Sequence, residues 1–69
     1  MKEVFIKDEF IKLGQAMKLA GAVGSGLDAK MLIQDGEVTV NDEVELRRGR
    51  KLYKDDIFSY EGEEYIIKN

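Results

Sequence analysis

The spacing of apolar residues changes at Gly36, and this change limits the chain to folds that combine helices with strands. Before Gly36, apolar residues recur at the spacing of one helix face, namely Leu13, Ala16, Met17 and Ala20. After it, residues 37–40 alternate between polar and apolar side chains, which is the period of a half-buried strand. A chain with both periods is typical of an α+β domain.

The helical part is predicted to contain two short helices, residues 12–20 and 26–35, joined by a glycine-rich connection at 21–26. Ser25 is the predicted N-cap of the second helix, and Asp28 follows it at the spacing of a capping box. Gly36 suits the left-handed position that commonly ends a helix.

The remaining segments predict strands and turns. Residues 3–7 are a predicted first strand, and two hairpins are predicted at 37–46, around Asn41-Asp42, and at 57–67, around Glu61-Gly62. Residues 47–51 are predicted to be a loop or irregular strand that bends at Gly49. The predicted order is β-α-α-β-β-β-β, with two short helices packed on a small, twisted, mainly antiparallel sheet. We expect residues 1–69 to form a single domain.

The composition excludes several classes of chemistry. The chain has no Cys and no His, so thiol and imidazole catalysis, thiolate zinc sites and disulfides are excluded. No segment is apolar enough to span a membrane, and 69 residues leave little room for a desolvated catalytic pocket. We therefore expect a cytoplasmic protein that is not an enzyme and needs no cofactor or metal.

Charge is distributed unevenly along the sequence. The whole chain has 11 Lys plus Arg and 14 Asp plus Glu, a net charge of −3. Residues 47–54, however, hold five cations and no acid, while residues 1–46 and 55–69 each sum to −4. The local field around the basic segment thus differs in sign from the total charge.

The three arginines of the chain all lie in this segment, at positions 47, 48 and 50. The planar guanidinium pairs with phosphate through two hydrogen bonds and stacks on bases. The outward positions of the predicted helices add further polar groups, namely Lys12, Gln15, Lys18 and Lys30. This pattern predicts either a nucleic-acid-binding surface or, as an alternative, a protein-interaction module whose basic loop docks on an acidic partner.

Residues 11–60 resemble the S4 RNA-binding domain family, which has the αL fold. The matching residues are Lys12-Leu13, Ser25, Ala29-Lys30, Leu32-Ile33, the segment Gly36-Glu37-Val38-Thr39-Val40-Asn41, and Asp56. The order of the Asn41 turn and the basic segment is similar to that of small stand-alone bacterial members of the YaaA type. The Gly-x-Val-x-Val-Asn element is the most specific part of the resemblance.

The resemblance implies binding to structured RNA, ribosomal or transfer RNA, and association with ribosomal particles; we expect the protein to be a monomer. Carried over by position, the RNA contacts would be Lys12, Gln15, Ser25, Gly26 and Lys30 on the helices, and Asn41, Arg47, Arg48, Arg50 and Lys51 on the loop. The family often has Asp at Gly14 and Arg at Gly26. The helix face is therefore less basic than usual, so we expect the loop to contribute more of the RNA binding.

Overall fold

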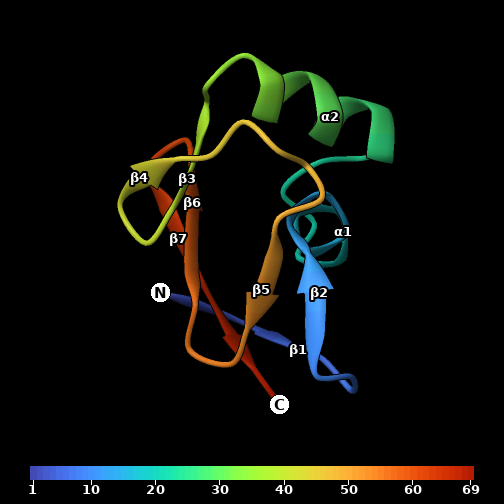
Figure 1. Ribbon diagram of the computed structural model, residues 1–69, viewed down its shortest axis with the longest axis vertical. Coiled ribbons are helices and arrows are strands. Elements are labelled where there is room, and N and C mark those ends of the chain that lie inside the picture. Colours follow the sequence, from blue (N-terminus) through green and yellow to red (C-terminus); the bar gives the residue numbers. More distant parts are fainter.

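A computed structural model describes all residues, 1–69, as two helices and seven strands (Figure 1). In chain order these are β1 (Lys2–Phe5), β2 (Phe10–Lys12), α1 (Leu13–Leu19), α2 (Gly26–Gln34), β3 (Val38–Val40), β4 (Glu43–Val44), β5 (Lys51–Tyr53), β6 (Ile57–Tyr60) and β7 (Glu63–Lys68). Both predicted helices form, and the α+β class is confirmed. Neither helix is long and apolar enough to cross a membrane.

Five strands form one sheet in the order β1-β7-β6-β3-β4. The two predicted hairpins supply four of its five strands, and each turns through residues with positive φ, which match the twist of the flanking strands. At the first turn these are Asn41 and Asp42, with φ of 51° and 71°. β1 pairs with β7 in parallel, and every other pairing in the sheet is antiparallel. The prediction of a mainly antiparallel sheet is therefore confirmed.

A second sheet of two strands was not predicted. β2 pairs antiparallel with β5, and this ribbon stands beside the larger sheet (Figure 1). The predicted order, with five strands, therefore lacked both β2 and β5, and the last residue of the predicted loop or irregular strand at 47–51 begins β5. Each strand has only three residues, which is too short to display a period, and its partner lies far away in the sequence.

The predicted helix signals are confirmed in detail. The Ser25 hydroxyl accepts a hydrogen bond from the Asp28 N–H at 3.1 Å, which caps α2. Gly36 follows the last turn of α2 with φ of +80°, and its N–H donates to the Ile33 carbonyl. These two residues fix where the helical half of the chain passes into the sheet.

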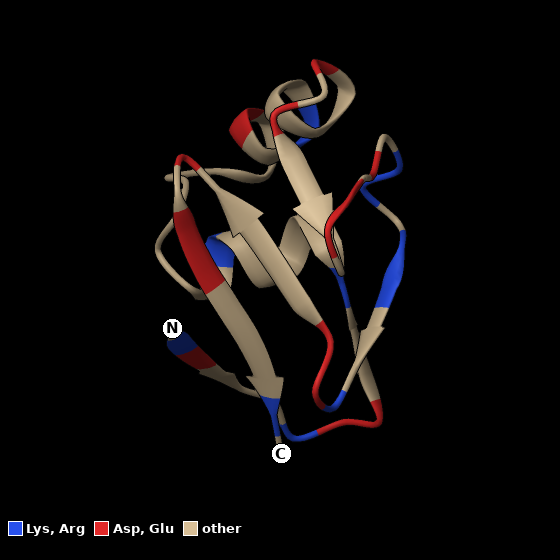
Figure 2. Cartoon of the chain, turned by 90° about the vertical axis from the view of Figure 1, so that its left-hand side faces the viewer, with Lys and Arg blue, Asp and Glu red and all other residues tan.

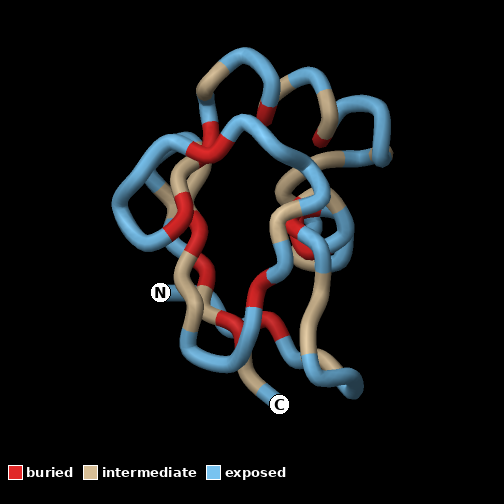
Figure 3. The backbone as a smooth tube through the Cα atoms, in the orientation of Figure 1, coloured by how far each residue is buried: buried red, intermediate tan, exposed pale blue.

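The core lies between the helices and the strands, as the buried segments in Figure 3 show. Leu13, Ala16 and Met17 of α1 are fully buried, so the predicted apolar stripe is confirmed. On the sheet, the rings of Phe58 and Tyr65 stack with centroids 4.7 Å apart. With a small core and no covalent cross-link, this packing must supply most of the stability.

Candidate nucleic-acid interface

The basic loop, which we define as residues 47–50, is fixed to the first turn of α1 by backbone hydrogen bonds. Helix starts leave N–H groups without partners, and no side chain caps α1. Instead, the Leu13 N–H donates to the Arg50 carbonyl at 2.8 Å, and the Gly14 N–H donates to the Arg48 carbonyl at 3.0 Å. The start of the helix thus positions the loop.

Gly14 lies where the basic loop and α2 both approach the first turn of α1. A Cβ at Gly14 would lie 3.5 Å from the Arg48 Cβ and 4.0 Å from the Ala29 Cβ, which are ordinary van der Waals distances. A small side chain would therefore fit at this position without displacing either segment. Gly14 gives up roughly 1 kcal/mol of helix propensity relative to Ala at this position.

A polar hollow of about 410 Å³ lies where α1, the start of α2 and the basic loop meet. None of its lining residues is hydrophobic or acidic; they are Lys12, Gly14, Gln15, Lys18, Gly26, Arg48 and Gly49. Three cationic side chains therefore surround one concave surface without a carboxylate in its lining. Such a surface attracts an anion, because no protein counter-ion competes for the cations.

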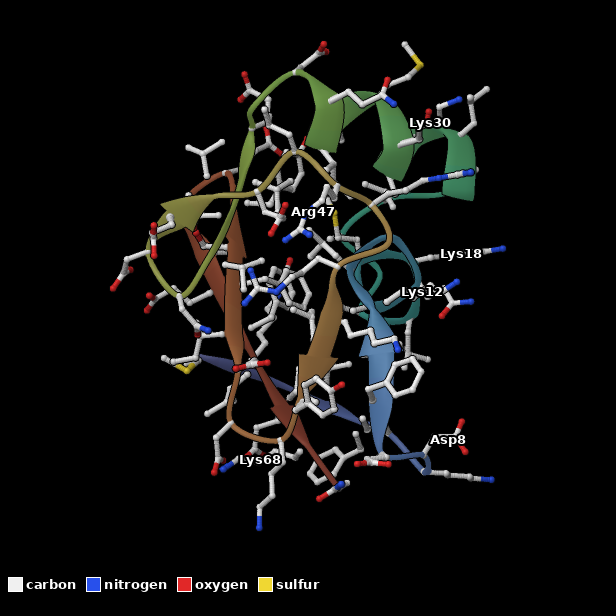
Figure 4. The ribbon with its side chains drawn as sticks, viewed as in Figure 1. Asp8, Lys12, Lys18, Lys30, Arg47 and Lys68 are labelled. Atoms are coloured by element: carbon white, nitrogen blue, oxygen red, sulfur yellow. The ribbon has the colours of Figure 1, made fainter.

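The hollow brings together four of the residues predicted to contact RNA, namely Lys12, Gln15, Gly26 and Arg48. It adds Lys18, which the resemblance did not carry over. Helical spacing had already placed Lys18 on the outward face of α1 together with Gln15. Lys12, predicted to lie on this helix, is instead the last residue of β2, directly before α1. In Figure 4 the labelled Lys12 and Lys18 both extend from the α1 side of the molecule.

Two of the three arginines have an acidic partner inside the protein. Glu45, only 8% exposed, accepts hydrogen bonds from Arg47 Nε at 3.0 Å and from Arg50 Nη1 at 2.9 Å. The Arg47 Nη2 and backbone N–H also donate to this carboxylate, at 3.2 and 3.1 Å. We call these three residues the Glu45 cluster. Because both Glu45 carboxylate oxygens accept hydrogen bonds from arginines, the buried carboxylate has no unpaired oxygen.

The Glu45 cluster also shifts the pKa values of its members. The hydrogen bonds from Arg47, followed by those from Arg50, lower the pKa of Glu45 to about 2 from its ordinary 4.5, against an opposing effect of burial. Glu45 in turn raises the pKa of Arg47. The sequence did not reveal this cluster, since Glu45 sits in an alternating segment whose apolar neighbours, Val44 and Leu46, are 60% and 57% exposed.

Comparison with known proteins identifies the architecture. The sequence profile described as "S4 domain" matches residues 4–68. The chain belongs to the S4 domain family. A probable ribosome maturation protein, RlbA of Bacillus subtilis (strain 168), is 49% identical over 59 residues, which cover 86% of this chain and 83% of the relative. The family resemblance seen in the sequence is thereby confirmed, and the protein is an S4 RNA-binding domain of a non-catalytic family.

The S4 domain places the other predicted residues outside the polar hollow. Lys30 is half-buried on α2, and its side chain is labelled in Figure 4. Ser25 uses its hydroxyl as the α2 cap. The Asn41 side chain donates to Asp56 at 3.2 Å and accepts from the Ile57 N–H at 3.0 Å, so it joins the β3–β4 turn to the start of β6.

Lys51 takes a separate position on the two-stranded ribbon. Its Nζ lies 4.6 Å from the centroid of the Phe10 ring, a cation–π contact on an exposed surface. The predicted residues thus divide among the polar hollow, the Glu45 cluster, the β3–β4 turn, the ribbon and, for Ser25 and Lys30, α2 outside the hollow. Elsewhere, no three carboxylates converge as metal ligands would.

Proposed function

We propose that this S4 domain binds structured RNA, ribosomal or transfer RNA, through the polar hollow and acts as a monomer in the cytoplasm on maturing ribosomal particles. The observation that supports the proposal most directly is the convergence of Lys12, Lys18 and Arg48 on a concave surface without an acid. The name of the Bacillus relative supports the ribosomal part.

Recognition would depend on shape and on phosphates. The deep, narrow major groove of an RNA helix hides its base edges, so proteins contact phosphates, 2′-hydroxyls and distorted loops. Arg48 supplies a planar fork for one phosphate, and Lys12 and Lys18 supply point charges on either side of Gln15. The Gln15 amide can both donate to and accept from a 2′-hydroxyl.

The distribution of acids favours one orientation on RNA. Figure 2 shows the basic residues around the 47–51 segment along one edge, next to the acidic stretch at 42–45, while Asp and Glu also occupy turns and part of β7. Acidic surfaces repel the phosphate backbone, so a protein with a net charge of −3 approaches RNA productively through its basic edge. The net charge also suppresses non-specific binding.

The salt dependence of RNA binding tests the proposal. Three phosphate contacts predict a slope of log K against log salt of roughly −2 to −3, and Arg48→Gln should make the slope less negative by about 0.7–0.9. Filter binding to ribosomal RNA fragments and transfer RNA measures both slopes. Lys68→Gln is the matched control, because Lys68 lies at the far end of β7 beside Asp55 (Figure 4). A wild-type slope near zero would overturn the proposal.

Crosslinking in cells distinguishes RNA from an acidic protein partner. Wild type should enrich RNA over the folded double variant Lys12→Glu/Arg48→Glu, and sequencing would identify that RNA. Reversing all three arginines would be a poor test, since it would place three new carboxylates near Glu45 and disrupt the loop. Equal RNA recovery from both proteins, with an acidic protein lost from the variant, would favour the protein-interaction function instead.

A further inference from the structure

The outward face of the β2–β5 ribbon presents two aromatic rings and two lysines. In the antiparallel register Phe10 lies opposite Tyr53, and Lys12 lies opposite Lys51. Residues directly opposite each other, and residues two apart along a strand, share one face of a sheet. The intervening pair, Ile11 and Leu52, therefore faces the other way, and Leu52 is fully buried.

The ring of Tyr53 on this face is open to solvent. Tyr53 is 44% exposed, whereas the aromatic pair of the larger sheet, Phe58 and Tyr65, is buried. The centroid of the Phe10 ring lies 5.9 Å from that of Tyr53, and the two planes are tilted by 49°. Phe10 thus packs against Tyr53 while nearly half of Tyr53 remains exposed to solvent.

The two lysines on this face form a like-charge pair. Cations directly opposite each other on neighbouring strands destabilise a sheet, and neither Lys12 nor Lys51 has an acidic partner. A bound anion would relieve this repulsion. Lys12 also lines the polar hollow, so the ribbon face continues directly from that surface.

We propose that the ribbon face binds an unpaired nucleotide of the RNA, with its base stacked on Tyr53 and its phosphates beside Lys12 and Lys51. Every base has a π-face, and exposed aromatic rings beside cations are the usual platform for single-stranded RNA. Phe10 is a positioning residue that holds the Tyr53 ring. The inference rests on the proposed function and extends it: the domain recognises a junction where a paired segment, bound in the polar hollow, passes into a single strand.

Binding of two RNA probes tests the ribbon separately from the hollow. Tyr53→Leu should weaken binding of a short oligoadenylate by about five- to 100-fold and leave binding of a blunt RNA duplex unchanged. Tyr53→Phe keeps the ring and should retain oligoadenylate binding. Unchanged oligoadenylate affinity in Tyr53→Leu, or equal losses on both probes, would overturn the ribbon proposal. Duplex binding that depends on Arg48 would still support the hollow.

A fluorescent variant reports stacking directly. The chain has no Trp, so Tyr53→Trp introduces a single indole, and Tyr60→Trp provides a matched control on β6 of the other sheet. Oligoadenylate should quench the indole at position 53 and leave the indole at position 60 unchanged. Absence of quenching at position 53 while the oligonucleotide is bound, or equal quenching at both positions, would contradict stacking on the ribbon. A protein that binds neither probe would contradict the proposed function as well.

Discussion

The polar hollow and the Glu45 cluster are built from the same short loop, yet they use its arginines in opposite ways. Arg48 lines the hollow, and no carboxylate lies within ion-pair distance of it. Arg47 and Arg50 both bind the buried carboxylate of Glu45. One arginine is therefore free to bind a phosphate, while the other two hold the loop in shape.

This difference shows that a run of positive charge cannot be read as a count of RNA contacts. The negative charge of Glu45 offsets part of the +5 charge of residues 47–54, so RNA would encounter a weaker positive field there. In exchange, it orders the loop whose backbone carbonyls hold the start of α1. The cluster would thus support binding indirectly, because a pre-ordered loop loses less conformational entropy when RNA binds.

Glu45→Gln should have the largest effect, because it removes the charge that both arginines share. We expect the free energy of unfolding to fall by about 1.5–3 kcal/mol, the range for hydrogen bonds to charged groups. Urea unfolding followed by circular dichroism measures this loss. Glu43→Gln, at an exposed position of β4, is the matched control and should change stability by no more than about 0.5 kcal/mol. Equal losses of stability in Glu45→Gln and Glu43→Gln would contradict a special stabilising role for the Glu45 cluster.

Low pH should abolish the stabilisation that the Glu45 cluster gives to the folded protein. The pKa of Glu45 is lowered from 4.5 to about 2 in the folded protein, so its stabilisation is fully present above pH 4.5. It is lost as pH falls from about 4.5 toward 2, because protonation then removes the negative charge. The stability difference between wild type and Glu45→Gln should accordingly shrink over this interval. Unfolding curves at several pH values test this, and a difference that stays constant down to pH 2 would contradict it.

Gly14→Asp should have the smallest effect, and it should weaken RNA binding without destabilising the fold. The new Cβ would make an ordinary contact, 3.5 Å from the Arg48 Cβ, and the carboxylate would stand among the free cations. RNA affinity should fall about fivefold, since opposite charges about 4 Å apart in water interact by about 1 kcal/mol. Stability should hold or rise, because an acid favours a helix start. Gly14→Asn is the uncharged control, and an equal loss of affinity there would point to shape rather than charge.

The sequence predicted the features that depend on local chemistry. The Ser25 cap, the end of α2 at Gly36 and both hairpin turns follow from preferences of neighbouring residues, and the structure contains all of them. Helical spacing likewise placed Gln15 and Lys18 on the outward face that lines the hollow, whereas Lys12 reaches the hollow from the end of β2. Their part in RNA binding remains a prediction.

The features that sequence reasoning missed depend on distant partners. The β2–β5 ribbon joins two strands of three residues each. Three residues are too few for an alternation of polar and apolar side chains to be recognised. Glu45 directly follows β4. In an alternating segment the polar residues normally face water, but Glu45 is buried because two arginines further along the chain bind its carboxylate. Neither fact can be deduced from propensities or spacing.

The parallel pairing of β1 with β7 has a consequence for how the protein is made. Lys2 to Phe5 lie beside Tyr65 to Lys68, so the first strand has no neighbour in the sheet until the last strand has been synthesised. Pairings between segments so distant in sequence form slowly, because closing the long intervening loop costs entropy before any contact is gained. The β3–β4 hairpin can therefore form while the chain is still growing, but the β6–β7 hairpin and the finished sheet can form only after translation has passed residue 68.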